Sequence, residues 1–288
     1  MTSILPTRPL GRTGEQVTIF GLGGEGVLRT HGRMAEAVAV IHRALDLGVN
    51  YYDSAPAYAG CLNYLGEGLA GRREGVFVAS KTHDRSREGS LKLLDDTLAR
   101  LGTDHLDLWQ LHDLRTQRDL DAIFGKGGAM EALLEARDAG RVRYLGLTGH
   151  HDPAILQEAM RRFTFDTVLV ALNAADRHRL SFIETVLPEA NANDIGIIAM
   201  KVYGAGSLLG PHGLRSDEAL SYALTLNGVR TAIVGCSSPV EVEENVRIAT
   251  NFAPLSDDEM TSLEQRTAKH AATFASFKKP PFVSLRGT

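Results

Sequence analysis

Leu106-Asp107-Leu108-Trp109-Gln110-Leu111-His112 is the stretch that decides the fold. Its short apolar run closes on an ionisable residue, and two earlier segments share that design: Asn50-Tyr51-Tyr52-Asp53 and Val76-Phe77-Val78-Ala79-Ser80-Lys81. Neighbouring parallel strands bring their carboxyl ends to one edge of a sheet. Because Asp and Lys are seldom buried unless paired, packing alone does not explain these strand ends. The pattern predicts a shared site at the rim of a parallel sheet.

Short apolar runs alternate with longer amphipathic stretches along the whole chain. After a hairpin around Gly11 to Gly14, the expected strands are Val17–Gly21, Asn50–Asp53, Val76–Lys81, Leu106–Leu111, Tyr144–Thr148, Thr167–Leu172, Gly196–Met200 and Thr231–Val234. The expected helices span 34–47, 61–70, 88–101, 128–139, 153–162, 181–191, 216–226 and 239–249. This order predicts one domain, 1–288, with a single (β/α)8 TIM barrel over about 17–249 and a C-terminal extension, 251–288, of one helix and a tail.

Helix boundaries carry their own signals. Asp152-Pro153 and Ser238-Pro239 each place a capping side chain before a proline of the first helical turn. Asp46-Leu47-Gly48 and Asp138-Ala139-Gly140 are typical of helix ends with a glycine stop. Ser256-Asp257-Asp258-Glu259 predicts a capped start for the extra helix.

A glycine-rich motif favours a different fold. Gly21-Leu22-Gly23-Gly24-Glu25-Gly26 fits G-x-G-x-x-G directly after an expected strand, which is the dinucleotide fingerprint of an open Rossmann sheet. That fingerprint needs a helix that begins within the glycines, whereas residues 27–33 intervene here. We interpret the glycines as a barrel loop that lets the backbone approach a ligand, with the open sheet as the alternative.

Composition excludes several classes of function. A net charge of −4 provides no basic face for nucleic acid or anionic lipid. No segment resembles a signal peptide or a membrane span, so we expect a cytoplasmic protein. Cys61 and Cys236 give no disulfide framework or zinc spacing. No metal cluster emerges from the histidines, since the adjacent His150 and His151 are not expected to face one ion.

Asp53, Tyr58, Lys81 and His112 together suit the protonation of an oxyanion. A phenol has a pKa of about 10, and we expect the ammonium of Lys81 to lower the pKa of Tyr58. Asp53 can keep Lys81 charged, and His112 can hydrogen-bond a carbonyl oxygen. Singly, each residue fits a structural role, as half of an ion pair, a loop aromatic or a strand-end histidine. Jointly they predict a proton relay for carbonyl reduction by hydride.

These segments resemble the aldo-keto reductase superfamily. The matching stretches are Asn50–Tyr58, Ala79–Lys81, Leu101–His112, Gly140–Gly146 and Ser237–Asn245, and the resemblance covers roughly residues 8–260. It implies a (β/α)8 barrel that binds NADPH in an extended pose and reduces a small aldehyde or ketone, as a monomer by family default. It also implies Tyr58 as the general acid, Lys81 and Asp53 as residues that tune it, and His112 as the residue that orients the carbonyl.

The resemblance implies a cofactor site as well. Its expected residues are Gly23, Thr148, His150, Met200, Lys201, Gly204, Gly206, Ser207, Gly235, Ser237, Ser238, Glu241, Glu244 and Asn245. The grip on the nicotinamide amide departs from the family, since Thr148-Gly149-His150 replaces the usual Ser-Asn and Leu169 replaces a Gln. Met200 stands where an aromatic ring often stacks. His150 either substitutes for the lost amide partner or is an exposed residue before the Asp152 cap.

The phosphate end of the site also leaves alternatives. Residues 202–208 and 235–238 offer backbone N–H groups and a helix amino end to a pyrophosphate. Glu241 stands where the family often has Arg or Gln near a 2′-phosphate, and its carboxylate suits a free ribose hydroxyl instead. It also fits a capping box with Ser238. The serines of the second loop and Arg247 could still hold a 2′-phosphate. NADPH is the expected cofactor, with NADH as the alternative.

Three activities remain open. The first is an NAD(P)H-dependent reductase of small aldehydes, ketones or sugar-like carbonyls. The second is a cofactor-binding sensor or regulatory subunit with little turnover, motivated by the altered amide grip. The third is an isomerase or lyase in which Lys81 forms a Schiff base. Loops 24–33 and 113–128 and the tail after residue 270 are expected to border the substrate.

Overall fold

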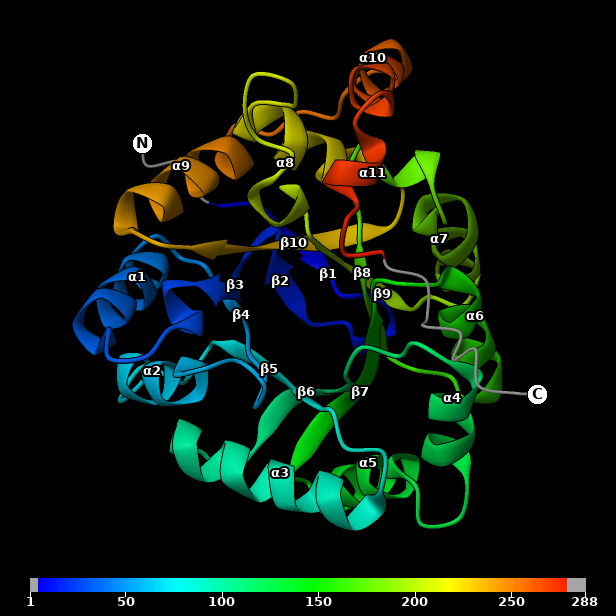
Figure 1. Cartoon of the computed structure of the whole chain (residues 1–288). Coiled ribbons are helices and arrows are strands. Elements are labelled where there is room, and N and C mark those ends of the chain that lie inside the picture. Colours follow the sequence, from blue (N-terminus) through cyan, green and yellow to red (C-terminus); the bar gives the residue numbers. More distant parts are fainter. Residues whose placement is uncertain (1–4, 279–288) are drawn as a thin grey trace.

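The computed structural model describes residues 5–278, which form a closed barrel of eight parallel strands with helices around it (Figure 1). The barrel strands are β3 (Phe20–Gly26), β4 (Tyr51–Asp53), β5 (Phe77–Thr82), β6 (Leu106–Leu111), β7 (Val142–Gly149), β8 (Thr167–Ala171), β9 (Gly196–Met200) and β10 (Val229–Cys236). Neighbours pair in chain order, and β10 pairs with β3 to close the ring. The predicted (β/α)8 barrel is confirmed, and the open Rossmann sheet is wrong.

The helices lie outside the strands, and most begin and end where the sequence predicts. They are α1 (Met34–Asp46), α2 (Cys61–Gly68), α3 (Arg87–Leu101), α4 (Gln117–Phe124), α5 (Ala129–Asp138), α6 (Pro153–Arg162), α7 (Phe182–Ala192), α8 (Ser216–Thr225), α9 (Pro239–Thr250), α10 (Asp257–Ala268) and α11 (Ala271–Phe274). Asp152, Ser238 and Ser256 accept backbone hydrogen bonds at helix starts. Gly48 and Gly140 follow α1 and α5 with φ of 80° and 73°.

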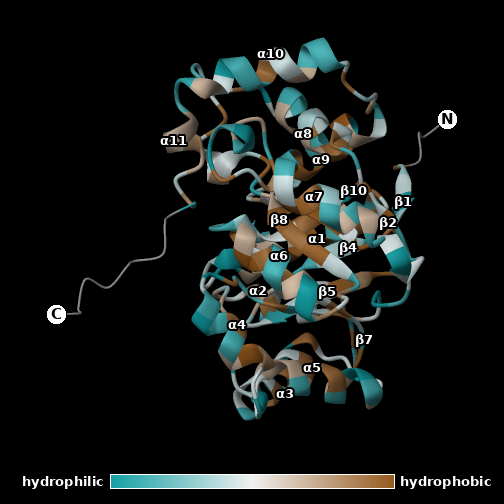
Figure 2. Ribbon diagram, turned by 90° about the vertical axis from the view of Figure 1, so that its right-hand side faces the viewer, coloured by the Kyte–Doolittle hydropathy of each residue, from teal (hydrophilic) through white to brown (hydrophobic). Residues whose placement is uncertain are grey.

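Hydrophobic side chains form two layers, one between strands and helices and one inside the barrel. Figure 2 shows the strands as mainly hydrophobic, while α10 at the edge is mainly hydrophilic. The hairpin of β1 (Thr7–Pro9) and β2 (Gln16–Thr18) sends Leu10 and Val17 into the inner layer. A Cβ on Gly196 would lie 2.9 Å from Leu10 Cδ1 and 3.0 Å from the backbone carbon of Leu10, so glycine here allows the hairpin to approach β9 closely. The hairpin therefore plugs one end of the barrel.

The first barrel strand begins later than predicted. It was expected at Val17–Gly21, but residues 16–18 pair with β1 in the antiparallel hairpin, and β3 starts at Phe20. The glycines of the G-x-G-x-x-G motif therefore lie in a strand, and not in a loop as predicted. A Cβ on Gly24 would lie 2.8 Å from the carbonyl oxygen of Asp53, so the close approach of β3 and β4 requires glycine.

Two segments predicted as irregular contain helices. The loop 113–128 holds α4, which starts with a capping box between Thr116 and Asp119. The extension after α10 holds the short α11, and the remainder of the predicted tail, from Lys279 onward, lies outside the described residues. Among residues 5–278, no helix combines the length and apolarity that a bilayer crossing requires.

Candidate active site

The carboxyl ends of β4, β5 and β6 bring the four predicted residues together. Asp53 ends β4, Lys81 lies near the end of β5, His112 follows β6, and Tyr58 comes from the loop after β4. Lys81 Nζ donates to Asp53 Oδ2 at 2.6 Å and to the carbonyl oxygen of Ser54 at 2.7 Å. The side chains of this ion pair are 1% and 2% exposed, so the pair is shielded from water.

Tyr58 packs against Lys81 and His112, the two residues that are expected to assist it. Lys81 Nζ lies 5.0 Å from the centre of the Tyr58 ring, and the His112 ring meets it edge-on at 5.7 Å. Burial and the charges of Asp53 and Glu25 hold the pKa of Tyr58 well above its ordinary value. The pKa of Tyr58 is therefore raised overall, where the sequence predicts a lowered one, because burial and the two carboxylates dominate while the ammonium of Lys81 donates to Asp53. Tyr58 keeps its proton at neutral pH.

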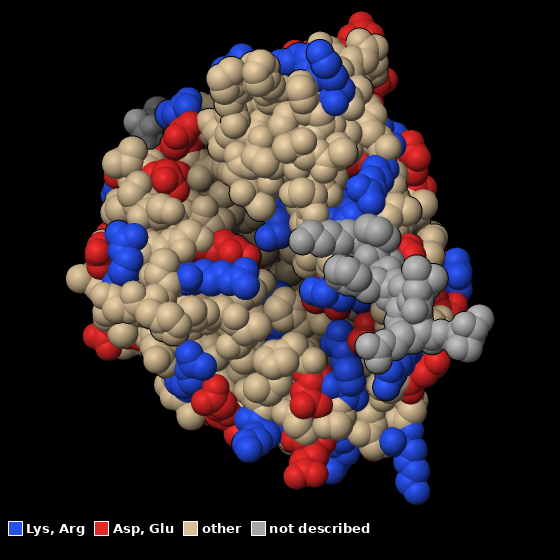
Figure 3. All heavy atoms as spheres, in the orientation of Figure 1, with Lys and Arg blue, Asp and Glu red and all other residues tan. Residues whose placement is uncertain are grey.

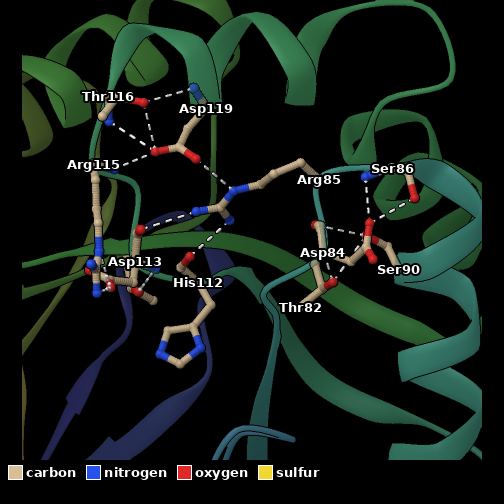
Figure 4. Close-up of polar contacts among 11 residues, drawn as sticks. Thr82, Asp84, Arg85, Ser86, Ser90, His112, Asp113, Arg115, Thr116 and Asp119 are labelled. Carbon is tan, nitrogen blue, oxygen red and sulfur yellow. Dashed lines mark hydrogen bonds and ion pairs between the residues drawn. The ribbon is translucent and has the colours of Figure 1, made fainter. Parts of the chain in front are cut away.

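His112 is neutral and firmly held. Burial, and then the charge of Lys81, lower the pKa of His112 to about 3. Figure 4 shows the Arg85 guanidinium donating to the carbonyl oxygens of His112 and Asp113, at 2.9 and 3.1 Å, and to Asp119 Oδ1 at 3.1 Å. Asp113 has a φ of 55°, which few residues other than glycine adopt. The arginine therefore clamps the turn that carries His112, a role that the sequence did not reveal.

A long cavity of about 520 Å³ extends from Asp53 and Tyr58 to the amino end of α9. The predicted cofactor residues that line it are Gly23, Met200, Lys201, Gly206, Gly235, Ser237, Glu241, Glu244 and Asn245. Leu169, which stands where the family has the Gln that holds the nicotinamide amide, also lines this cavity. Sequence reasoning missed Leu209 and Ile233, because apolar residues carry no chemical signal of their own, and it missed Ser216 at the start of α8.

Five predicted cofactor residues lie elsewhere. Gly204, Ser207 and Ser238 do not line the long cavity. Ser207 Oγ donates to the carbonyl oxygen of Gly204 at 2.6 Å, and Ser238 caps α9, so both hydroxyls serve local structure. Thr148 and His150 line a second cavity of about 440 Å³ beside His112. The two cavities share Glu25, Tyr58, Met200 and Lys201, so they meet at the predicted general acid.

The cavity wall at the amino end of α9 is acidic. Glu241 accepts a hydrogen bond at 2.7 Å from the backbone nitrogen of Ser237, one residue before the N-cap Ser238. Its carboxylate therefore folds back on the helix start without completing the predicted capping box with Ser238. Glu244 accepts from the Ser216 hydroxyl. Arg247 lines neither cavity. A 2′-phosphate would therefore meet carboxylates at this end.

His150 is half-buried, which excludes the exposed reading. Its side chain is 21% exposed, and its Nδ1 lies 3.3 Å from Asp113 Oδ1. His151 Nε2 lies 3.4 Å from the same oxygen, so the two adjacent histidines do converge on one point, contrary to expectation. Figure 3, in the orientation of Figure 1, shows that Lys, Arg, Asp and Glu side chains surround the hollow at the centre of the molecule.

The sequence model of the Aldo/keto reductase family matches residues 19–217. The chain belongs to this family. L-galactose dehydrogenase of Arabidopsis thaliana is 30% identical to it over 89% of this chain and 92% of that protein. D-threo-aldose 1-dehydrogenase from a Pseudomonas species is 25% identical over 76% and 84%. The holo form of an aldo-keto reductase from Bacillus halodurans has the same fold, with a TM-score of 0.77 at 23% identity over 91% and 96%.

The long cavity fits the nicotinamide cofactors that aldo-keto reductases use. Backbone lines it where β3 and β10 approach, because a Cβ on Gly23 would lie 3.1 Å from Gly235 N and narrow the passage. Ser237 and Glu241 place the amino end of α9 on its wall, where backbone N–H groups favour an anion. Leu169 and Met200 give the end near Tyr58 an apolar surface for a ring.

Proposed function

We propose that the protein is an NAD(P)H-dependent oxidoreductase that reduces an aldehyde or ketone to an alcohol. The observation that carries the proposal is the position of a protonated Tyr58, packed against neutral His112 and the Lys81–Asp53 pair, where the two cavities meet. A donor at such a junction can serve a substrate in one cavity and a cofactor in the other.

The chemistry of each residue follows from its surroundings. A nicotinamide cofactor bound in the long cavity would supply the hydride to the carbonyl carbon. Tyr58 would donate its proton to the carbonyl oxygen, and the neutral ring of His112 would donate a hydrogen bond to that oxygen and orient it. The positive charge of Lys81 would stabilise the phenolate left on Tyr58, and Asp53 would keep that ammonium in place.

The choice of cofactor follows from charge. The sequence predicts NADPH, but Glu241 and Glu244 line the far end of the cavity, and Lys201 lies at the other end near Glu25. This distribution supports the NADH alternative, because carboxylates repel a 2′-phosphate and can accept from a free ribose hydroxyl. Calorimetric titration with each cofactor tests it. Tighter binding of NADPH than of NADH would instead support NADPH, the cofactor predicted from the sequence.

The other two activities have less support. A regulatory subunit would explain the altered amide grip, yet Leu169 and Met200 line the cavity and the four-residue constellation is complete. A Schiff base needs a neutral amine, whereas Lys81 Nζ donates to Asp53 and to a carbonyl oxygen. Reduction is therefore the activity that uses all four residues.

A carbonyl panel with Tyr58→Phe as the variant tests the proposal. The panel includes sugars and is also run in the direction of oxidation, because two relatives are named as sugar dehydrogenases. We expect kcat to fall by about 10²- to 10⁴-fold in the variant while cofactor binding is unchanged. Wild-type turnover in Tyr58→Phe would overturn the assignment of the acid. Cofactor binding without turnover of any compound would favour the regulatory subunit.

A further inference from the structure

Three side chains that can bind a metal ion meet at the carboxyl ends of β6 and β7. Asp113 lies in the turn after β6, and His150 and His151 follow β7 directly. Each residue offers one ligand atom, and these atoms lie within 4.8 Å of one another. Asp113 and His150 line the second cavity, and His151 is buried. Two neighbouring strands therefore bring a carboxylate and two imidazoles to one point.

The contacts within this cluster are longer than hydrogen bonds of a charged group. Asp113 Oδ1 lies 3.3 Å from His150 Nδ1 and 3.4 Å from His151 Nε2. Hydrogen bonds from nitrogen to an ionised carboxylate are about 2.7–2.9 Å long. Asp113 Oδ1 is buried, and no aligned hydrogen bond from the described residues reaches it. This oxygen is therefore open to a ligand of opposite charge.

The same distances are typical of two neighbouring ligands on one small cation. Zinc binds histidine nitrogen at about 2.0–2.1 Å and carboxylate oxygen at about 2.0–2.2 Å, usually with four ligands in a tetrahedron. These bond lengths place two ligand atoms of one ion about 3.3 Å apart. Asp113 Oδ1 therefore has the spacing of a zinc ligand from both imidazole nitrogens.

The carboxylate of the cluster is held in place by its surroundings. The backbone nitrogen of Asp113 donates to Thr148 Oγ1 at 2.8 Å, and its carbonyl oxygen accepts from Arg85 at 3.1 Å. Asp113 Oδ2 accepts from Arg115 Nε at 2.7 Å, which leaves Oδ1 for the imidazoles. The backbone has a φ of 55°, a conformation that persists only where the surroundings impose it. Outer hydrogen bonds of this kind commonly orient a metal-binding carboxylate.

The two imidazole rings are positioned by packing. The ring centres of His150 and His151 are 4.4 Å apart, and the Phe277 ring meets His150 edge-on at 6.1 Å. His150 presents Nδ1, the nitrogen nearer its backbone, whereas His151 presents Nε2, the farther one. This difference in reach explains how adjacent residues can direct their rings at the same carboxylate oxygen.

The ligand atoms determine which class of cation fits. Imidazole suits zinc and similar transition metals, whereas magnesium and calcium prefer oxygen ligands only. Two positive side chains near the cluster oppose a cation, but neither lies at Asp113 Oδ1. Arg115 contacts the other carboxylate oxygen and is 55% exposed, so water screens its charge. Lys201 Nζ lies 3.4 Å from Glu25 Oε1, which offsets its charge.

We propose that Asp113, His150 and His151 form a binding site for one divalent cation of the zinc class, with its remaining coordination position toward the second cavity. The ion joins the turn after β6, which carries His112, to the loop after β7, and so fixes one wall of that cavity. It stabilises the folded chain, because the unfolded chain does not hold the three ligands together. The inference goes beyond the proposed function and does not depend on it.

Calorimetric titration of the full chain with zinc chloride tests the site. The protein carries no polyhistidine tag and is treated with a chelator and dialysed first. We expect one equivalent of zinc to bind, and magnesium chloride at the same concentration to give no binding. In thermal unfolding, zinc at about 100 times its Kd should raise Tm by about 4 °C. Both measurements omit substrate and cofactor, so they are independent of the proposed reductase activity.

Variants locate the bound zinc. His150→Ala removes one ligand, and Asp113→Asn removes the charge of another while it tolerates the positive φ. Each should weaken zinc binding by at least about 100-fold, more than the loss of an outer partner usually costs. His105→Ala is the matched control, because His105 Nδ1 lies 2.7 Å from Asp104 Oδ1 at the surface, and it should keep the wild-type Kd. Thermal unfolding of every variant without metal separates loss of the site from loss of the fold.

Three results would overturn the inference. The first is the absence of zinc binding to the wild-type chain. The second is zinc binding of wild-type strength in His150→Ala or Asp113→Asn, which would place the ion elsewhere. The third is equal affinity for magnesium, which would contradict the zinc class. If His150→Ala is unfolded without metal, Asp113→Asn decides, because it keeps the size and shape of the side chain that Arg115 and Thr148 hold.

Discussion

Two buried lysine–aspartate pairs in this chain differ in how completely they are satisfied. Lys81 and Asp53 at the barrel mouth make a 2.6 Å contact, and Lys81 has one further acceptor, the carbonyl oxygen of Ser54. Asp53 Oδ1 is buried without an aligned hydrogen bond from the described residues. Because this oxygen has no aligned hydrogen bond, the pair can respond when a neighbouring group changes its charge, as Tyr58 would during proton transfer.

The second pair, Lys278 and Asp176, is saturated. Lys278 Nζ contacts Asp176 Oδ1 and donates to the carbonyl oxygens of Arg179 and Leu180 at 2.9 and 3.0 Å. Asp176 Oδ2 accepts from the Ser181 hydroxyl at 2.9 Å. Each remaining hydrogen-bonding group has a partner, so the pair anchors the C-terminal extension to the loop after β8.

Two ion pairs that are equally buried can therefore have different roles. A buried pair with every atom satisfied resists change, because any proton movement would leave a charge unpaired in a medium that solvates it poorly. A pair with an unsatisfied oxygen beside a cavity can respond to new charge. The comparison predicts that breaking the first pair removes activity and that breaking the second removes stability.

The largest expected effect is on turnover in Lys81→Met. Without the ammonium, the phenolate that forms on Tyr58 has no opposite charge beside it, so kcat should fall by about 10³-fold. Steady-state kinetics measure it, with Lys278→Met as the matched control, for which kcat should stay within about tenfold of wild type. Equal losses in the two variants would show that the pairs are not functionally distinct.

Stability should fall when the saturated pair is broken. Lys278→Met leaves Asp176 buried without its partner and should lower the free energy of unfolding by about 3–5 kcal/mol. Urea denaturation of the full chain measures the loss. Lys278→Met combined with Asp176→Asn should be less destabilised than the sum of the single variants, because the two residues interact directly. Additive losses would mean that the extension is held by other contacts.

The pKa of His112 provides a third test of the difference between the Lys81–Asp53 and Lys278–Asp176 pairs. The charge of Lys81 contributes to the low pKa of His112, about 3, so this pKa should rise in Lys81→Met and stay unchanged in Lys278→Met. Proton NMR titration of the imidazole signals measures it. An unchanged pKa in Lys81→Met would mean that burial alone keeps the ring neutral.

The same lowering makes stability depend on pH. His112 and His150 have folded pKa values of about 3 and 4, below the unfolded value of about 6.5, so the folded chain binds fewer protons. Their contribution is present above about pH 6.5 and is lost as the pH falls from there toward 4 for His150 and toward 3 for His112. His150→Gln should flatten this part of the curve of unfolding free energy against pH, whereas the exposed control His42→Gln should not. A curve that stays equally steep in His150→Gln would contradict the lowered pKa.

The first of the two pairs could be predicted from the sequence. Asp53 and Lys81 each stand near the end of an apolar run, and consecutive strands of a barrel are neighbours, so local patterns were enough to bring them together. His112 was placed by the same rule. The position of the first strand was wrong because its glycines are poor strand formers, and only the pairing of β3 with β10 makes them part of the sheet.

The second pair and the Asp113–His150 contact could not be predicted. Lys278 lies 102 positions from Asp176, and no periodic pattern connects a tail with a loop at that distance. Asp113 reaches His150 only because its backbone takes a left-handed turn that Arg85 and Thr148 hold in place. Such contacts depend on tertiary geometry, which propensity and spacing do not encode.

An exposed pair gives the smallest expected effect and tests whether burial governs the comparison. Arg29 Nη1 donates to Glu25 Oε1 at 2.9 Å, but the side chains are 47% and 39% exposed. Water screens this pair, so Arg29→Met should change the free energy of unfolding by less than about 1 kcal/mol, close to the value for the exposed control Lys92→Met. Denaturation of both variants beside Lys278→Met measures the series. A loss of several kcal/mol in Arg29→Met would mean that contact with the Tyr58 ring, 5.0 Å from the guanidinium, outweighs exposure. The contribution of an ion pair to stability would then not be set by its burial alone.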